Sequence, residues 1–129
     1  MTPEKRILYR DDGSIQEEEW WVEGKLHRLD GPAIVLYWVN GGVLREEWRV
    51  EGKRHRLDGP AVIWYWESGP VTEEGWWFEG KRHRLDGPAR VWYWEDGSVL
   101  NESWRVNGKE LTKEEFQQYQ TLNSIDKDF

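Results

Sequence analysis

A 28-residue repeat constrains this chain more than any other feature of its sequence. Trp20, Trp48, Trp76 and Trp104 follow one another at equal intervals, one in each repeat. Glycines and tyrosines keep the same step, at Gly24, Gly52, Gly80 and Gly108 and at Tyr9, Tyr37, Tyr65 and Tyr93. A unit of this length cannot bury its own apolar face and must stack on its neighbours. The spacing therefore predicts one continuous sheet or solenoid.

Each unit shows the alternation of β-strands. The segment 43–50 reads V-L-R-E-E-W-R-V, with Trp and Val on one face and Arg or Glu on the other. Turn dipeptides such as Asp12-Gly13 and Glu23-Gly24 recur at the repeat distance, and glycine supplies the positive φ of a tight hairpin turn. We expect an all-β fold, a single curved antiparallel sheet of eight strands in stacked β-hairpin repeats. The hairpins are expected at about 7–22, 33–50, 61–78 and 89–106.

The last segment changes to a helical pattern. Thr112 and Glu115 have the spacing of a capping box, and Leu111 and Phe116 that of a hydrophobic staple. These features predict a short C-terminal capping helix at about 113–121, which covers the end of the last hairpin because an open sheet edge invites aggregation. Residues 123–129 are polar and are expected to form a frayed tail. The 129 residues are expected to form a single repeat domain.

The composition argues against several classes of protein. Cysteine is absent, which removes disulfide frameworks, thiol nucleophiles and thiolate metal sites. The formal net charge of −7 argues against a nucleic-acid-binding protein. No apolar run reaches the roughly 18 residues of a membrane span, and the first residues lack a signal-peptide core. We therefore expect a cytoplasmic protein with no membrane partner.

The repeated string W-x-V-x-G-K-x-H-R-x-D-G-P-A resembles the MORN repeat in a longer variant, like repeats of phage and giant-virus proteins. Its core H-R-L-D-G-P-A occurs three times at fixed spacing, and the resemblance covers nearly the whole chain. The ordinary MORN unit is shorter, and its second glycine after the histidine is replaced here by arginine, at Arg28, Arg56 and Arg84. The resemblance implies an elongated sheet of stacked hairpins that acts as a scaffold or binding surface. Related bacterial proteins are antitoxin-like partners of toxins.

The three connectors combine residue types that are common in catalytic and metal sites. They carry His27, His55 and His83, Arg28, Arg56 and Arg84, and Asp30, Asp58 and Asp86. Two-stranded units stack at roughly 9.6 Å, so histidines of neighbouring units cannot share a metal that needs each nitrogen at about 2.0–2.1 Å. A catalytic group is normally unique, whereas this motif is repeated. We expect a structural role, with no metal, no cofactor and no enzymatic activity, and keep ligand binding by the histidines and arginines as the alternative.

The aromatic residues are the stronger functional clue. The positions after the repeating tryptophans differ between units and point to the opposite face of the sheet; they are Trp21, Arg49, Trp77 and Arg105. The adjoining strands add Trp38, Trp66 and Trp94. Either the sheet curls and buries this surface, with arginines stacked on indole rings, or the surface is exposed and has the composition of binding hot spots. We take these seven residues as candidate binding residues. An acidic row at Glu18, Glu46, Glu74 and Glu102 is expected to be solvated or to steer a basic partner.

Two functions stay open. The first is a non-catalytic protein–protein interaction module, such as a phage-encoded inhibitor or antitoxin-like factor in the host cytoplasm. The second is an anti-defence protein that binds or sequesters a small ligand, either a nucleotide or a phosphorylated signal. An exposed aromatic stripe would favour the first, and a closed pocket containing Arg28, Arg56 or Arg84 with tryptophan walls would favour the second. Self-association is compatible with both.

Overall fold

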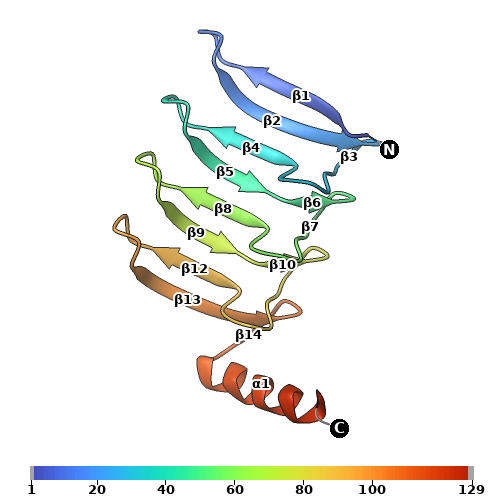
Figure 1. The fold of residues 1–129 in the computed structure, drawn as a ribbon, viewed down its shortest axis with the longest axis vertical. Coiled ribbons are helices and arrows are strands. Elements are labelled where there is room, and N and C mark those ends of the chain that lie inside the picture. The colour runs from blue at the N-terminus through green and yellow to red at the C-terminus, as the bar shows by residue number, and fades with distance from the viewer. Residues whose placement is uncertain (1, 128–129) are drawn as a thin grey trace.

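A computed structural model, which describes residues 2–127, has one antiparallel sheet of stacked hairpins followed by one helix (Figure 1). Ten strands form the main sheet in the order β1-β2-β4-β5-β8-β9-β12-β13-β14, with β3 paired to β2. The sheet is open and the hairpins follow one another along its long axis (Figure 1). The fold class expected from the sequence is confirmed.

Each repeat contributes one long hairpin. The outgoing strands are β1 (Glu4–Tyr9), β4 (Ile34–Tyr37), β8 (Val62–Tyr65) and β12 (Arg90–Tyr93). The returning strands are β2 (Ile15–Val22), β5 (Val43–Glu47), β9 (Val71–Gly75) and β13 (Val99–Val106). The register shifts before each hairpin turn, as between Leu36 and Tyr37. These four hairpins are the ones that the repeat spacing predicts.

A second, shorter hairpin in each repeat was not expected. It joins β2 to β3 (Lys25–Leu26), β6 (Arg49–Val50) to β7 (Lys53–Arg54), β10 (Trp77–Phe78) to β11 (Lys81–Arg82), and β13 to β14 (Lys109–Leu111). At its turn Glu51 and Gly52 have φ angles of 50° and 82°, and positive φ at both central residues is the requirement of a type I′ turn. The described chain therefore has fourteen strands rather than eight.

The same hydrogen bonds join each repeat to the next. The Gly52 N–H donates to the Leu26 carbonyl at 2.8 Å, and the Glu51 N–H donates to His27 Nδ1 at 2.9 Å. Both bonds recur in the next two repeats, where His55 and His83 are the acceptors. The histidines therefore hold adjacent repeats together, which is the structural role expected from the sequence.

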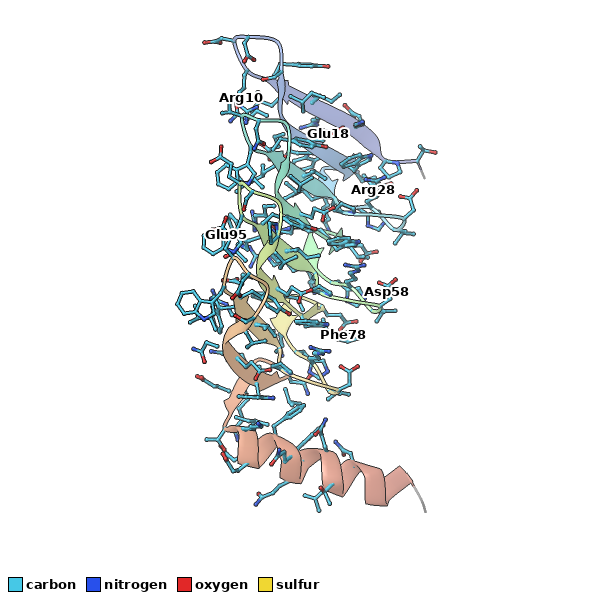
Figure 2. All side chains as sticks on the ribbon, turned by 60° about the vertical axis from the view of Figure 1, so that its left-hand side comes forward. Arg10, Glu18, Arg28, Asp58, Phe78 and Glu95 are labelled. Atoms are coloured by element: carbon cyan, nitrogen blue, oxygen red, sulfur yellow. The ribbon has the colours of Figure 1, made fainter. Side chains whose placement is uncertain are left out.

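The buried core is a thin row of small and β-branched side chains. Ala33, Ala61 and Ala89 are completely buried, and Val35, Val62 and Val91 nearly so. The repeating tryptophans, expected in the core, are only half-buried. A single-layer sheet has no second layer to cover them, and side chains project from both of its faces (Figure 2). Guanidinium groups cover three of them instead, 4.0, 3.9 and 3.9 Å from the ring centroids, in the pairs Arg28–Trp20, Arg56–Trp48 and Arg84–Trp76.

The helix α1 (Lys113–Lys127) packs against β13 and β14. The expected capping box is present, because the Thr112 N–H donates to Glu115 Oε1 at 2.9 Å and the Glu115 N–H donates to Thr112 Oγ1 at 3.1 Å. Phe116 is 2% exposed. The expected frayed tail is wrong for residues 123–127, because no glycine or proline interrupts the helix; residues 128–129 lie outside the described residues. In the described chain, no helix has the length and apolar character needed to cross a membrane.

Candidate functional site

The strand register divides the side chains between two faces of the sheet. The repeat-invariant face carries the tryptophans Trp20, Trp48, Trp76 and Trp104 and, two residues before each of them, Glu18, Glu46, Glu74 and Glu102. The variable face carries Trp21, Arg49, Trp77 and Arg105. Register pairs such as Arg45–Trp64 and Glu73–Trp92 place further arginine, glutamate and tryptophan side chains on the variable face.

Polar side chains of the repeat-invariant face are paired inside the sheet. The hydroxyl groups of three tyrosines donate to the carboxylates of the acidic row, in the pairs Tyr37–Glu18, Tyr65–Glu46 and Tyr93–Glu74. Burial and the hydrogen bond to Glu18 raise the pKa of Tyr37 to about 12. The expectation of a solvated acidic row is therefore wrong for these three glutamates, since each already has a partner.

The connectors are paired in the same way. Arg56 donates from Nε to Asp58 at 2.9 Å and from Nη1 to the Pro60 carbonyl at 2.9 Å, and its guanidinium lies over Trp48. Arg28 and Arg84 make the equivalent bonds. Surface hollows of about 790 and 720 Å³ lie between successive connectors. Each of their arginines forms an ion pair with the aspartate of its own connector, so within residues 2–127 these hollows contain no arginine that lacks an ion-pair partner.

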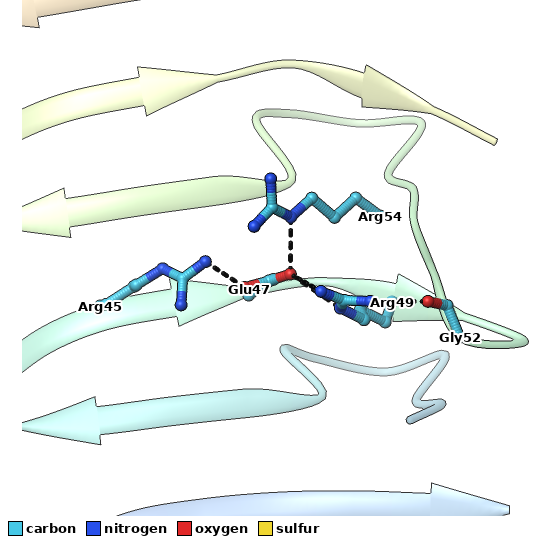
Figure 3. A network of polar contacts seen from close by, with 5 residues as sticks. All are labelled: Arg45, Glu47, Arg49, Gly52 and Arg54. Carbon is cyan, nitrogen blue, oxygen red and sulfur yellow. Dashed lines mark hydrogen bonds and ion pairs between the residues drawn. The ribbon is translucent and has the colours of Figure 1, made fainter. Parts of the chain in front are cut away.

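On the variable face, the second repeat contains a buried ion-pair network (Figure 3). Glu47 is 1% exposed. Its Oε1 accepts from Arg49 Nε at 2.7 Å and from Arg54 Nε at 2.7 Å, and Arg45 donates to Oε2. Burial alone would raise the pKa of Glu47, but the hydrogen bond from Arg54 and the charges of the three arginines hold it below its ordinary value. One carboxylate thus forms ion pairs with three guanidinium groups, although the Nε atom of Arg45 is buried without a hydrogen-bond partner among the described residues.

The third repeat keeps an arginine but lacks this carboxylate. Gly75 stands one repeat after Glu47, while Arg82 stands at the equivalent of Arg54. Trp77 replaces Arg49, and the guanidinium groups of Arg54 and Arg82 lie over its ring at 4.9 and 4.8 Å. The network of the second repeat therefore has no counterpart in this part of the described chain.

A hollow of about 610 Å³ opens on this part of the variable face, and its lining includes Trp77, Arg82, Arg90, Trp92, Ser103 and Arg105. Arg90 pairs with Glu73 at 2.9 Å, and Arg105 approaches Glu110 at 3.5 Å. Arg82 makes no ion pair within residues 2–127. Its Nη1 atom and the Nε atom of Arg90 are buried without a hydrogen-bond partner among those residues. We take this basic hollow as the candidate functional site.

The electrostatics of Arg82 reflect this arrangement. Burial and the nearby charge of Arg90 lower the pKa of Arg82 to about 10, with Glu73 opposing the shift only in part. A buried guanidinium N–H without an acceptor, as at Arg82 Nη1, costs folding free energy. An anion that entered the hollow would remove that cost.

The candidate residues from the sequence divide into three groups. Trp77 and Arg105 line the hollow. Arg49 belongs to the Glu47 network, and Trp21 lies under the guanidinium of Arg6 at 4.8 Å. The remaining three, Trp38, Trp66 and Trp94, follow the last residues of β4, β8 and β12, at the hairpin-turn edge of the sheet. The structure therefore does not bring them together with the hollow.

Exposure separates Trp66 and Trp94 from the other candidate tryptophans, including Trp38, which is half-buried at the same edge. Trp66 and Trp94 are 37% and 54% exposed, whereas Trp21 and Trp77 are half-buried beneath arginines. Figure 2 shows the two edges, with Arg10 and Glu95 on the hairpin-turn side and Arg28, Asp58 and Phe78 on the connector side. The stacking of arginines over indole rings, one of the two alternatives drawn from the sequence, is present on both faces.

Sequence reasoning did not single out Gly75 or Arg82. A signal for them exists in the columns of equivalent positions, which read Glu19, Glu47, Gly75 and Ser103 in one case and Leu26, Arg54, Arg82 and Glu110 in another. In the third repeat the first column no longer has an acidic residue, whereas the second column still has an arginine.

The hollow has the chemistry of a binding site. Guanidinium groups bind carboxylates and phosphates through paired hydrogen bonds, and indole rings offer flat apolar contact. Within residues 2–127, no group of three His, Asp or Glu side chains is arranged to hold a metal ion. The chain was compared with protein-family models, curated proteins and solved structures, and none of them matches it.

Proposed function

We propose that this chain is a non-catalytic binding protein whose variable face recognises another protein. The observation that carries the proposal is the contrast between the two faces. On the repeat-invariant face the same pairs recur in successive repeats, as with Tyr65–Glu46 and Tyr93–Glu74. On the variable face the side chains change from repeat to repeat and leave buried guanidinium atoms without partners among the described residues. Scaffolding alone gives no reason for that difference.

The composition of the variable face supports a protein partner. Tryptophan and arginine are enriched at interface hot spots, where half-buried aromatic anchors stand among polar neighbours. Trp77 and Trp92 have this character beside Arg82 and Arg90. The MORN-like resemblance adds the finer proposal of a phage-encoded inhibitor or antitoxin-like factor.

The test begins with partner capture on the immobilised chain and ends with affinity measurement on the purified pair. Trp77→Ala is expected to weaken binding at least about 30-fold, the equivalent of the roughly 2 kcal/mol hot-spot threshold. The matched control is Leu29→Ala, which truncates a side chain that is 79% exposed on a connector. It should leave the affinity unchanged.

Melting curves of both variants separate binding from folding. Trp77→Ala removes a ring that stacks under Arg54 and Arg82, so Trp77→Phe is included because it keeps an aromatic ring there. Trp77→Phe should recover part of the affinity. A partner that binds Trp77→Ala as tightly as the parent chain would place recognition elsewhere, and Trp94, 54% exposed at the opposite edge, would be tested next.

A second candidate function, small-ligand binding, is favoured by the combination of a suitably sized hollow and an arginine without an ion-pair partner among residues 2–127. The volume of the hollow, about 610 Å³, lies within the range of roughly 300–1,000 Å³ typical of small-molecule sites. A thermal-shift panel of nucleotides tests this candidate. A rise in melting temperature that Arg82→Gln abolishes would support it, and a panel without any shift would count against it.

A further inference from the structure

The glycine beside the hollow is not required by the backbone. The turn glycines of the chain, such as Gly80 with a φ of 83°, have positive φ, but Gly75 is not among the positive-φ residues. Gly75 lies in β9 and pairs with Val62 and Arg90 in regular antiparallel register. The equivalent strand position one repeat earlier is occupied by Glu47. The strand geometry therefore accepts a glutamate here, once the Trp77 indole, whose Nε1 would lie 3.3 Å from the new Cβ, has shifted.

The absence of that glutamate leaves one positive charge without a partner. Arg90 and Arg105 each form an ion pair, with Glu73 and Glu110, whereas Arg82 forms none among residues 2–127 and feels the charge of Glu73 only from farther away. Lys81 and Glu102, which also line the hollow, add one charge of each sign, so the excess stays at one positive charge. A single carboxylate would balance Arg82, whereas a phosphate monoester would bring a charge of about −1.5 to −2 into a chain whose net charge is already −7.

We infer that the hollow is a recognition site for one carboxylate of a protein partner, which takes the place that Glu47 occupies one repeat earlier. The inference rests on the proposed function and names the group that the variable face binds. An aspartate or glutamate side chain of the partner enters between Trp77 and Trp92. Arg82 binds its carboxylate as Arg54 binds Glu47 (Figure 3).

The first experiment supplies the carboxylate from within the chain. A Cβ atom at position 75 would lie 3.3 Å from Trp77 Nε1 and 3.8 Å from Arg82 Nη1, so a longer side chain there reaches the Arg82 guanidinium after a small shift of the indole. Gly75→Glu and Gly75→Gln have the same shape and carry the same steric cost. The glutamate variant should melt about 5 °C higher than the glutamine variant, because a charge-assisted hydrogen bond contributes the difference.

Two controls identify the source of that shift. The difference between the two variants should disappear when Arg82→Gln is added to both, and also when the pH is lowered far enough to protonate the new carboxylate. Equal melting temperatures for Gly75→Glu and Gly75→Gln at neutral pH would overturn the inference, since the hollow would then not accept a carboxylate.

The second experiment supplies the carboxylate from outside. N-acetylglutamate α-amide, a single carboxylate on a neutral backbone, is titrated into the isotope-labelled chain while the indole N–H resonances of Trp77 and Trp92 are followed by NMR. Both resonances should shift when the probe is added to the parent chain. They should not change in Gly75→Glu, whose own carboxylate fills the site. Inorganic phosphate is titrated in parallel. Shifts with phosphate but none with the carboxylate probe would overturn the assignment and point to a phosphorylated ligand.

The partner assay keeps this inference separate from the proposed function. If Trp77→Ala weakens partner binding and Gly75→Glu weakens it at least tenfold more than Gly75→Gln does, both the proposed function and the carboxylate site are supported. If Trp77→Ala weakens the partner but Gly75→Glu and Gly75→Gln bind it equally well, only the carboxylate site is overturned. If Trp77→Ala has no effect on binding, the proposed function fails.

Discussion

Replacing Glu47 by glutamine tests whether the buried network stabilises the sheet. The change keeps the shape of the side chain but removes the charge that three arginines share. Removing one partner from a buried ion pair costs about 3–5 kcal/mol. The side chains of Arg45, Arg49 and Arg54 are 16%, 26% and 31% exposed, so water partly solvates them in the variant. We therefore expect a loss of about 2–3 kcal/mol in the free energy of unfolding.

Chemical denaturation at neutral pH measures this loss, and a thermal scan should show a decrease of roughly 10 °C in Tm. Glu95→Gln is the matched control, because Glu95 is exposed and accepts a hydrogen bond from Ser68 alone among the described side chains. That control should change the free energy of unfolding by less than about 0.5 kcal/mol.

The pH dependence identifies the charge as the cause. The pKa of Glu47 is lower in the folded chain than its ordinary 4.5. Its contribution is therefore complete above about pH 4.5 and disappears as the pH falls through the folded-state value. The difference between parent and Glu47→Gln should shrink in the same range. A variant as stable as the parent at pH 7, or a difference that stays constant into strong acid, would refute the reasoning.

Three further substitutions test contacts elsewhere in the chain. Tyr93→Phe should cost about 1–2 kcal/mol through the lost bond to Glu74. Burial and that bond raise the pKa of Tyr93 to about 12, so in denaturation series the parent should lose stability as pH rises above about 10 and the variant should lose less. His55→Ala removes the acceptor of the Glu79 N–H and should cost about 1–3 kcal/mol, and stoichiometric zinc in the parent that this variant lacks would contradict the structural role. Phe116→Ala truncates a side chain that is 2% exposed and should cost about 3–4 kcal/mol, with a decreased helical signal in far-ultraviolet circular dichroism if α1 detaches.

Features with a strong signal in the sequence itself are the ones that it predicts well. The regular spacing of Trp20 and its equivalents leads to the stacked hairpins, and Thr112 with Glu115 leads to the helix. The Glu-Gly turns are visible in the sequence, but the strand after each turn is only two or three residues long, too short to show an alternating pattern. A glutamate at positive φ, as at Glu51, is also unusual. Pairing with neighbouring strands stabilises this backbone conformation, and local backbone propensity does not predict such a tertiary effect.

The candidate site was only half predictable for a different reason. Trp77 and Arg105 stand out because their column varies between tryptophan and arginine. Arg82 looks ordinary in the sequence, since Arg54 precedes it at the same position. Arg82 differs from Arg54 because the position next to its guanidinium is Gly75 and not a glutamate. That difference depends on which two residues lie close together in the fold. Reading one strand at a time cannot detect it.

Because the same hydrogen bonds join each repeat to the next, whole repeats can be removed or added. Because His27 binds the Glu51 N–H and His55 binds the Glu79 N–H, excising residues 38–65 would bring Glu79 opposite His27 with the same spacing. The Gly80 N–H would then face the Leu26 carbonyl in place of the Gly52 N–H. Gene duplication or deletion of whole units can therefore lengthen or shorten the scaffold without new joints. Each such event would also reorder the side chains on the variable face, so a change in repeat number is at the same time a change in what the surface can bind.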